Sequence, residues 1–239
     1  MTTIRIMSYN LQGCRNLTAL CNAIEHAAAD FVALQNVTSL PAGQRLSDIA
    51  ASSGYIVVSS GATGVLALLA KQQVKFIQTY DLGDGAICMN ADLCVEEKRF
   101  NLLNIILGGG FFKRPEQIRR LLGPDLLDLQ NLKFPSLLLG DFYDIIWTSG
   151  HYRFNDQMRR FAPPILRGTY PAMLPIFSRD RVYATNSIKL SNINIDHSHN
   201  ARVATHHLPL ILDIEILDNR IALTQHAKEP RTRMEVAPG

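Results

Sequence analysis

Short apolar runs typical of strands alternate with segments of helical periodicity along most of this sequence, and this alternation is what most restricts its fold. In the segment 17–28, Leu17 and Ile24 fall on one face of a helix. Directly afterwards, residues 31–35 form an apolar run of the length expected for a buried strand. Repeated alternation of this kind favours a layered α/β domain, and 239 residues suffice for one such domain with a sizeable core.

The same patterns predict the extent of each element. Helices are expected at residues 17–28, 43–53, 115–129 and 155–161, and strands at 4–9, 31–35, 55–59, 64–70, 74–80, 86–95, 100–107, 136–139, 182–184, 188–195 and 208–216. No repeat or linker interrupts the sequence before residue 218, so we expect one domain over residues 1–217. Residues 218–239 lack apolar periodicity and are expected to form a mobile tail.

The composition excludes a disordered chain and restricts the choice of partner only weakly. Hydrophobic residues make up 47% of the sequence and charged residues 19%, which is typical of a chain that buries a core. The net charge of +3 is compatible with a polyanionic partner and equally with an ordinary solvated surface.

The N-terminal residues and the cysteines favour a cytoplasmic protein. Residues 1–9 have the pattern of a strand rather than of a secretion signal, and no apolar run reaches the roughly 18 residues that span a membrane. The four cysteines show no spacing typical of a zinc site, so we expect them to be reduced and mostly buried. Two disulfides in an exported protein are the alternative.

Six short motifs follow one another in an order that is typical of one protein family. Residues 204–215, Ala-Thr-His-His-Leu-Pro-Leu-Ile-Leu-Asp-Ile-Glu, resemble the Ser-Asp-His-Leu-Pro-Leu motif of the endonuclease/exonuclease/phosphatase superfamily. The other motifs are 4–13, similar to an opening strand that ends in Tyr-Asn; 30–37, similar to Asp-Val-Ile-Ala-Leu-Gln-Glu-Val; 100–107, similar to a strand that ends in Asn-Thr-His-Leu; 138–144, similar to Gly-Asp-Phe-Asn; and 168–183, similar to Thr-Phe-Pro…Arg-Leu-Asp-Arg-Ile. Each motif alone is weak, but together they cover residues 3–216.

This resemblance implies a four-layer α/β sandwich, in which two mixed, largely antiparallel β-sheets pack face to face and are flanked by helices. The site is then expected at one edge of the two sheets, in loops that follow their strands. Members of the family cleave phosphate esters, so the resemblance implies descent from a phosphodiesterase, nuclease or phosphatase. The fold alone does not supply a function.

Four catalytic residues of the family are matched in this sequence. Asp141 matches the aspartate that orients or deprotonates the attacking water, and His207 matches the final histidine. Asp180 matches the carboxylate that pairs with this histidine, and Asn10 matches the asparagine that positions groups around the phosphate. Each has a purely structural alternative: Asp141 as a turn cap, Asp180 with His207 as a structural pair, and Asn10 as a loop hydrogen-bonding residue.

Both metal-binding carboxylates of the family are replaced. Asn36 stands where the family has Glu, and His206 stands where it has Asp. Mg²⁺ prefers carboxylate oxygens, whereas Asn36 offers a neutral carbonyl and His206 a nitrogen that suits Mn²⁺ or Zn²⁺ better. If a divalent metal binds, the expected ligands are Asn36, His206 and Asp141.

Two further changes remove polar groups. Tyr143 replaces an asparagine that contacts phosphate in the family, and its larger ring is expected to obstruct a substrate. Ile106 replaces a histidine found in many members. Removing one oxyanion donor typically lowers the rate by roughly 10²–10³, so we expect classical Mg²⁺-dependent hydrolysis to be impaired.

Three hypotheses of function follow. In the first, the protein is a pseudoenzyme that acts by binding a phosphate ester, a nucleic acid or a protein partner. In the second, it is an active metal-dependent phosphoesterase or nuclease with a site rebuilt around Mn²⁺ or Zn²⁺. In the third, the fold serves only protein–protein contact, which an exposed apolar patch near the site would favour. His197 and His199 either bind a metal or lie in an exposed polar loop over residues 196–200.

Overall fold

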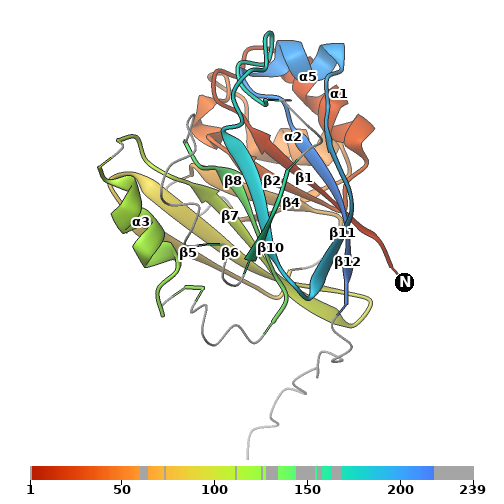
Figure 1. Cartoon of the computed structure of the whole chain (residues 1–239). Coiled ribbons are helices and arrows are strands. Elements are labelled where there is room, and N and C mark those ends of the chain that lie inside the picture. Colours follow the sequence, from red (N-terminus) through yellow and green to blue (C-terminus); the bar gives the residue numbers. More distant parts are fainter. Residues whose placement is uncertain are drawn as a thin grey trace, which may run out of the picture.

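Two six-stranded β-sheets pack face to face in the computed structural model (Figure 1). The structure describes residues 2–59, 64–72, 74–110, 112–124, 126–127, 134–143, 154, 158–162 and 168–217. The first sheet has the order β11 (Ile188–Ile195), β12 (Leu210–Ile216), β1 (Ile4–Asn10), β2 (Phe31–Gln35), β4 (Leu66–Ala70) and β3 (Ile56–Ser59). The second has the order β5 (Phe76–Gly83), β6 (Ala86–Val95), β7 (Lys98–Ile106), β8 (Ser136–Asp141), β10 (Asp180–Thr185) and β9 (Met158–Phe161).

Both sheets are mixed and largely antiparallel. In the first sheet β1 and β2 run parallel, and in the second β7 and β8 do. The other neighbouring strands pair antiparallel. The predicted pair of mixed sheets is therefore confirmed.

The alternation of side chains along each strand divides the apolar residues between separate cores. In β1, Ile4 and Ile6 face the second sheet, whereas Met7 and Tyr9 face the helices on the outer side. The core between the sheets includes Phe31, whose ring meets that of Phe100 edge to face at 6.2 Å. Side chains on one face of a strand thus pack against the helices, and those on the other face pack against the opposite sheet.

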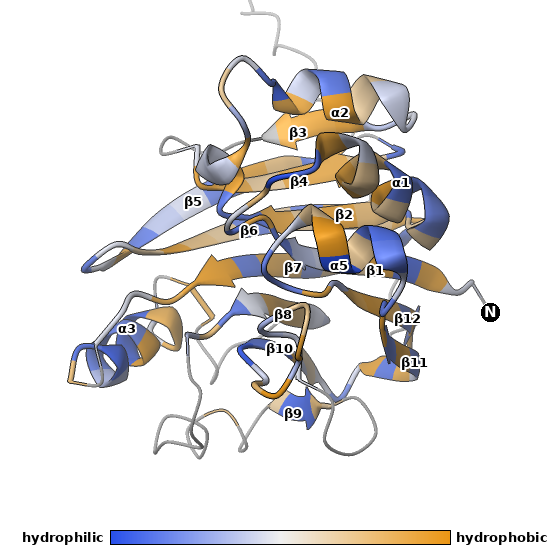
Figure 2. Ribbon diagram, turned by 90° about the horizontal axis from the view of Figure 1, so that it is seen from above, coloured by the Kyte–Doolittle hydropathy of each residue, from blue (hydrophilic) through white to orange (hydrophobic). Residues whose placement is uncertain are grey.

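Helices cover the outer faces of the two sheets. Figure 2 shows α1 (Leu17–Ala27), α2 (Leu46–Ser52) and α5 (His199–Ala204) on the outer side of the first sheet, and α3 (Arg114–Leu121) against the second. The α1 helix begins after Asn16, whose side chain accepts a hydrogen bond from the Ala19 N–H. The layers are those of the predicted four-layer α/β sandwich.

Three predictions fail in the kind of structure or by more than three residues at one end of the element. Residues 155–161 are predicted to be helical, but 158–161 form the edge strand β9 because they pair with β10, and 155–157 lie outside the described residues. The helix predicted over 115–129 ends at Leu121, since Gly123 and Pro124 cannot continue it, and 128–129 are not described. The loop expected at 196–200 runs into α5, whose N-terminus is capped by the Ser198 hydroxyl.

The predicted tail, residues 218–239, lies outside the described residues. In the part of the chain that the structure describes, no helix is long and apolar enough to cross a membrane. Cys14, Cys21, Cys88 and Cys94 are free cysteines. Only Cys88 is buried and the others are half-buried, so the expectation of mostly buried cysteines is wrong.

Candidate functional site

The candidate site lies at one edge of the sandwich, where strands of both sheets end or begin. Asn10, the last residue of β1, is in register with Gln35 at the end of the parallel strand β2. Asp141, the last residue of β8, lies opposite Asp180, the first residue of β10. Strand pairing therefore gathers these polar residues at a common edge, as the sequence predicts.

A glycine with a special conformation places Asp141 at the end of β8. Gly140 has a φ of +133°, and a Cβ atom there would lie 2.1 Å from the Ile105 carbonyl oxygen in β7. Only glycine fits this close approach of the two strands. The Gly-Asp-Phe motif thus has a packing reason for its first residue as well as a chemical reason for its second.

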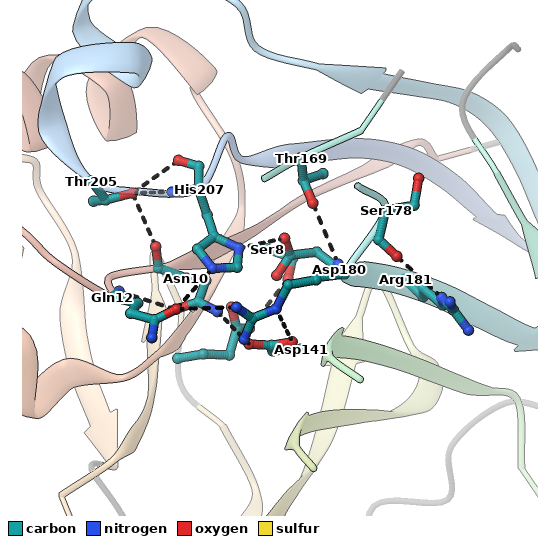
Figure 3. Close-up of polar contacts among 12 residues, drawn as sticks. Ser8, Asn10, Gln12, Asp141, Thr169, Ser178, Asp180, Arg181, Thr205 and His207 are labelled. Carbon is teal, nitrogen blue, oxygen red and sulfur yellow. Dashed lines mark hydrogen bonds and ion pairs between the residues drawn. The ribbon is translucent and has the colours of Figure 1, made fainter. Parts of the chain in front are cut away.

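Asp180 and His207 form a buried pair, with 2.8 Å between Oδ2 and Nδ1. The other ring nitrogen of His207 lies 3.1 Å from Gln12 Oε1 (Figure 3). Burial alone would raise the pKa of Asp180, but the charge of His207 and its hydrogen bond outweigh burial and lower that pKa. The pair predicted from the sequence is therefore in contact and favours the ionised carboxylate.

Three neighbours donate hydrogen bonds to the buried carboxylate of Asp141. Asn10 Nδ2 lies 2.9 Å from Oδ2, and the Tyr143 N–H lies 2.7 Å from Oδ1. Arg179 Nη2 lies 2.6 Å from Oδ2 in an ion pair whose side chains are only 6% and 1% exposed. Burial, followed by the Asp180 carboxylate, raises the pKa of Asp141, against the opposing effect of the Arg179 guanidinium.

Arg179 is the site residue that the motif comparison does not predict. Its guanidinium contacts two aromatic rings, 4.2 Å from the Tyr143 centroid and 4.9 Å from the Tyr170 centroid. Tyr170 also contacts His207, with ring centroids 4.8 Å apart. The available signal is that a charged residue, Arg179, stands before Asp180 where the similar family stretch Arg-Leu-Asp-Arg-Ile has leucine.

The Tyr143 side chain packs against Arg179. Its ring lies over the Arg179 guanidinium and is itself 42% exposed. Its backbone has a φ of 51°, in the left-handed region that is uncommon for a bulky residue. Ile106, at the end of β7, is in register with Asp141 and belongs to the core between the sheets.

Of the three expected metal ligands, Asn36 and Asp141 share a hydrogen-bonded neighbour, whereas the His206 ring lies apart from this network. Asn36 donates its amide N–H to Asn10 Oδ1 at 2.8 Å, and Asn10 in turn donates to Asp141. His206 has an exposed ring that packs against Gly13, where an added Cβ would come within 2.3 Å of the ring. The structure thus links Asn36 and Asp141 through Asn10, whereas the backbone of His206 donates to the Gln12 carbonyl oxygen and accepts from the Ala172 N–H.

These donors do not fit a divalent cation as they stand. Both oxygens of Asp141 already accept hydrogen bonds, and one of them forms the ion pair with Arg179. Asn36 presents its amide nitrogen, not its oxygen, to the neighbouring Asn10. Among the described residues, no group of three His, Cys, Asp or Glu side chains is placed to hold a metal ion. A divalent metal would need several free oxygen ligands.

Comparison with known proteins agrees with the fold and the motif order. The family model described as "Endonuclease/Exonuclease/phosphatase family" matches residues 7–200. An endonuclease/exonuclease/phosphatase from Bacteroides vulgatus superimposes with a TM-score of 0.74 at 14% identity, covering 90% of this chain and all of that chain (100%). Among curated protein sequences, none matches.

Two further structures with this fold are a phosphatase by name and a protein in complex with DNA. Mannosyl-6-phosphatase Bt3783 of Bacteroides thetaiotaomicron has a TM-score of 0.73 at 15% identity, covering 89% of this chain and 100% of that one. D. rerio TDP2, complexed with a single-strand DNA product, has a TM-score of 0.69 at 14% identity, covering 90% and 100%. The family match spans most of the sequence, so this chain belongs to the endonuclease/exonuclease/phosphatase family.

Proposed function

We propose that this chain is a family member that does not perform classical Mg²⁺-dependent phosphodiester hydrolysis and instead binds a phosphate ester or nucleic acid. The observation that carries this proposal is the buried ion pair between Asp141 and Arg179. A general base needs a lone pair directed at the attacking water. In this site the lone pairs of Asp141 face Asn10, Tyr143 and Arg179.

The charge of the site supports binding of an anion. Asn36 and His206 carry no carboxylate, and Arg179 offsets the negative charge of Asp141. Two further cations flank the edge: exposed Arg15 donates to the Val203 carbonyl oxygen, and Arg114 donates to that of Tyr143 at 2.9 Å. A less negative edge with cationic neighbours attracts a phosphate group without a bridging metal.

The relatives suggest the class of ligand. One neighbour is named as a sugar-phosphate phosphatase and another was crystallised with a single-strand DNA product. We therefore propose phosphate esters and single-stranded DNA as the first ligands to test. We also propose a cytoplasmic location, because a reducing compartment keeps cysteines free.

The proposal is tested with metal-stripped protein and chromogenic phosphodiester and phosphomonoester substrates, with Mg²⁺, Mn²⁺ or Zn²⁺ added separately. The Asp141→Ala variant serves as the control for contaminating hydrolases. We expect the wild type to be no faster than Asp141→Ala with any metal. Metal-dependent turnover that Asp141→Ala abolishes would contradict the proposal.

The same assay tests the second hypothesis, in which the protein is an active phosphoesterase with a rebuilt site. The retained pairs favour it: Asp180 with His207 at 2.8 Å, and Asn10 with Asp141 at 2.9 Å. On this hypothesis Mn²⁺ or Zn²⁺ restores turnover where Mg²⁺ does not.

A protein partner is a third candidate that one surface feature favours. Met173, Leu174 and Ile176 are 60–66% exposed on the turn between Tyr170 and Phe177. This turn adjoins the site, because the Ala172 N–H donates to the His206 carbonyl oxygen at 2.7 Å. A Leu174→Asp variant that retains DNA binding but loses a protein partner would favour this candidate.

A further inference from the structure

We infer that Arg179 supplies within the chain the positive charge that a divalent cation would otherwise supply at this edge, so that the site is complete without a metal. The inference concerns the composition of the site and holds whether the protein binds or cleaves its ligand. It disagrees with the metal that the family resemblance implies. It rests on four observations of the described residues.

The first observation is the position of the guanidinium. Besides its 2.6 Å contact with Asp141 Oδ2, Arg179 places Nε 3.4 Å from Oδ1 of the same carboxylate and Nη1 3.4 Å from Gln12 Oε1. Carboxylate and amide oxygens are the ligands that Mg²⁺ and Mn²⁺ prefer. The arginine therefore already occupies the oxygen atoms that would be offered to a cation.

The second observation is burial. The Arg179 side chain is 6% exposed and that of Asp141 is 1% exposed. Buried charges persist in proteins when they are paired and hydrogen-bonded, and arginine does not lose its proton. A divalent ion on Asp141 would meet a fixed cation in the same buried space, and the two like charges would repel each other.

The third observation concerns the remaining carboxylate. Among the described residues of the cluster, Asp180 carries the second carboxylate: its Oδ2 atom contacts His207, and its Oδ1 atom is buried and accepts no hydrogen bond. Thus each buried carboxylate at this edge has its own basic partner within the chain, Arg179 for Asp141 and His207 for Asp180. The charge of Asp141 is thus offset within the chain by Arg179, and a protonated His207 would offset that of Asp180.

The fourth observation is that two aromatic rings lie within cation–π distance of the guanidinium. Tyr143 and Tyr170 lie 4.2 Å and 4.9 Å from it, at distances where aromatic faces attract a cation. Tyr143 keeps its N–H on Asp141, so one residue both caps the carboxylate and covers the arginine. The carboxylate and the two rings therefore stabilise a guanidinium at this position.

The test is a Mn²⁺ titration of the wild-type protein followed by room-temperature electron paramagnetic resonance, in which bound Mn²⁺ loses its free-ion signal. We expect the free-ion signal to equal that of buffer, and the melting temperature to be unchanged by Mn²⁺ or by EDTA. One Mn²⁺ bound per chain in the wild type, and lost in Asp141→Asn, would overturn the inference.

A second measurement compares melting temperatures of Arg179→Met, Arg179→Lys and the double variant Arg179→Met/Asp141→Asn. We expect Arg179→Met to melt lowest, because it leaves a buried carboxylate unpaired. Arg179→Lys should recover part of the loss and the double variant most of it. An Arg179→Met variant as stable as the wild type would overturn the inference. If Arg179→Met does not fold, the wild-type Mn²⁺ titration alone decides.

The outcomes separate this inference from the proposed function. Turnover without any metal would contradict the binding proposal and leave the arginine inference intact. Mn²⁺ bound at Asp141 without turnover would contradict the arginine inference and leave the binding proposal intact.

Discussion

Three residues at the site form a series that runs from solvent to a buried acid. Tyr143 is 42% exposed, the Arg179 side chain beneath it is 6% exposed, and the Asp141 side chain is 1% exposed. Each contacts the next, through the cation–π contact and then the ion pair. The accessibility of the Asp141 carboxylate is therefore limited by a tyrosine and an arginine.

Replacing Tyr143 by the family's asparagine should uncover Arg179 without unfolding the protein. Asparagine adopts a φ near +51° more readily than tyrosine, which offsets the loss of a cation–π contact of about 0.5–1 kcal/mol. We expect the free energy of unfolding to change by less than about 1 kcal/mol. In Tyr143→Asn, Arg179 should be labelled faster by phenylglyoxal, as measured by peptide mass spectrometry.

Exposed Arg119 provides the internal control, because it should react equally in both proteins. If Arg179 reacts as fast in the wild type as in Tyr143→Asn, the tyrosine ring does not cover the guanidinium.

At the scale of elements, side-chain contacts tie the two sheets together at the site. Asn10 of β1 donates to Asp141 of β8, and His207, just before β12, contacts Asp180 of β10. Strands β1 and β12 belong to the first sheet, whereas β8 and β10 belong to the second. The polar cluster therefore joins the layers where the apolar core between them ends.

The Asp180–His207 contact should make stability depend on pH. The folded-state pKa of Asp180 is lowered, so the pair stabilises the fold above about pH 4 and loses this contribution as pH falls through the folded pKa. We expect the difference in urea midpoint between the wild type and Asp180→Asn to be largest near neutral pH and to shrink in acid. A difference that stays constant down to about pH 2 would contradict this assignment.

Gly140 should be the least replaceable glycine near the site. In Gly140→Ala the new Cβ would lie 2.1 Å from the Ile105 carbonyl oxygen, and alanine is strained at a φ of +133°. We expect a loss of more than about 2 kcal/mol in the free energy of unfolding, measured by urea denaturation. Gly109→Ala is the matched control, because its Cβ would make an ordinary 3.6 Å contact with Tyr143. Equal stability of the two variants would sink the packing argument.

Sequence patterns predict the central elements well because burial and pairing act in the same direction there. Strands β2, β6 and β11 have the predicted bounds. Their apolar patterns allow a single pairing register, because a shift by one residue would turn the buried side chains to the other face. The prediction fails at β9, where four residues at a sheet edge become a strand only through pairing with β10. It also fails at α5, six residues whose signal is little more than the Ser198 cap.

The site is predictable in its paired residues and not in its arginine. The motifs predict that Asp180 pairs with His207, and these two residues are in contact. The hydrogen bond from Asn10 to Asp141 joins strands of different sheets, and the motifs do not predict it. The identity of Arg179 does not say whether its side chain points to solvent or to Asp141, since that depends on Tyr143 and Tyr170, which come from other loops. Side-chain direction in loops is a tertiary property.

At the scale of the whole molecule, the cations that flank the site, Arg15 and Arg114, should make DNA binding sensitive to salt. For single strands the slope of log K against log salt is about −0.7 for each phosphate neutralised, so Arg15→Ala should reduce the slope by about 0.7. Fluorescence anisotropy with a labelled oligonucleotide measures it. Lys189→Ala is the control, because Lys189 pairs with Glu215 at the other end of β11 and β12. Binding that is independent of salt would exclude phosphate contacts at this edge.

An intramolecular ion pair with Arg179 occupies Asp141, the carboxylate that matches the aspartate of the Gly-Asp-Phe motif. The most direct measurement is a crystal structure of the protein grown with MnCl₂, with anomalous data collected at the manganese edge. The account predicts Arg179 bridging Asp141 and Gln12, with no anomalous peak beside either. A manganese peak on Asp141, with the guanidinium turned away, would contradict it.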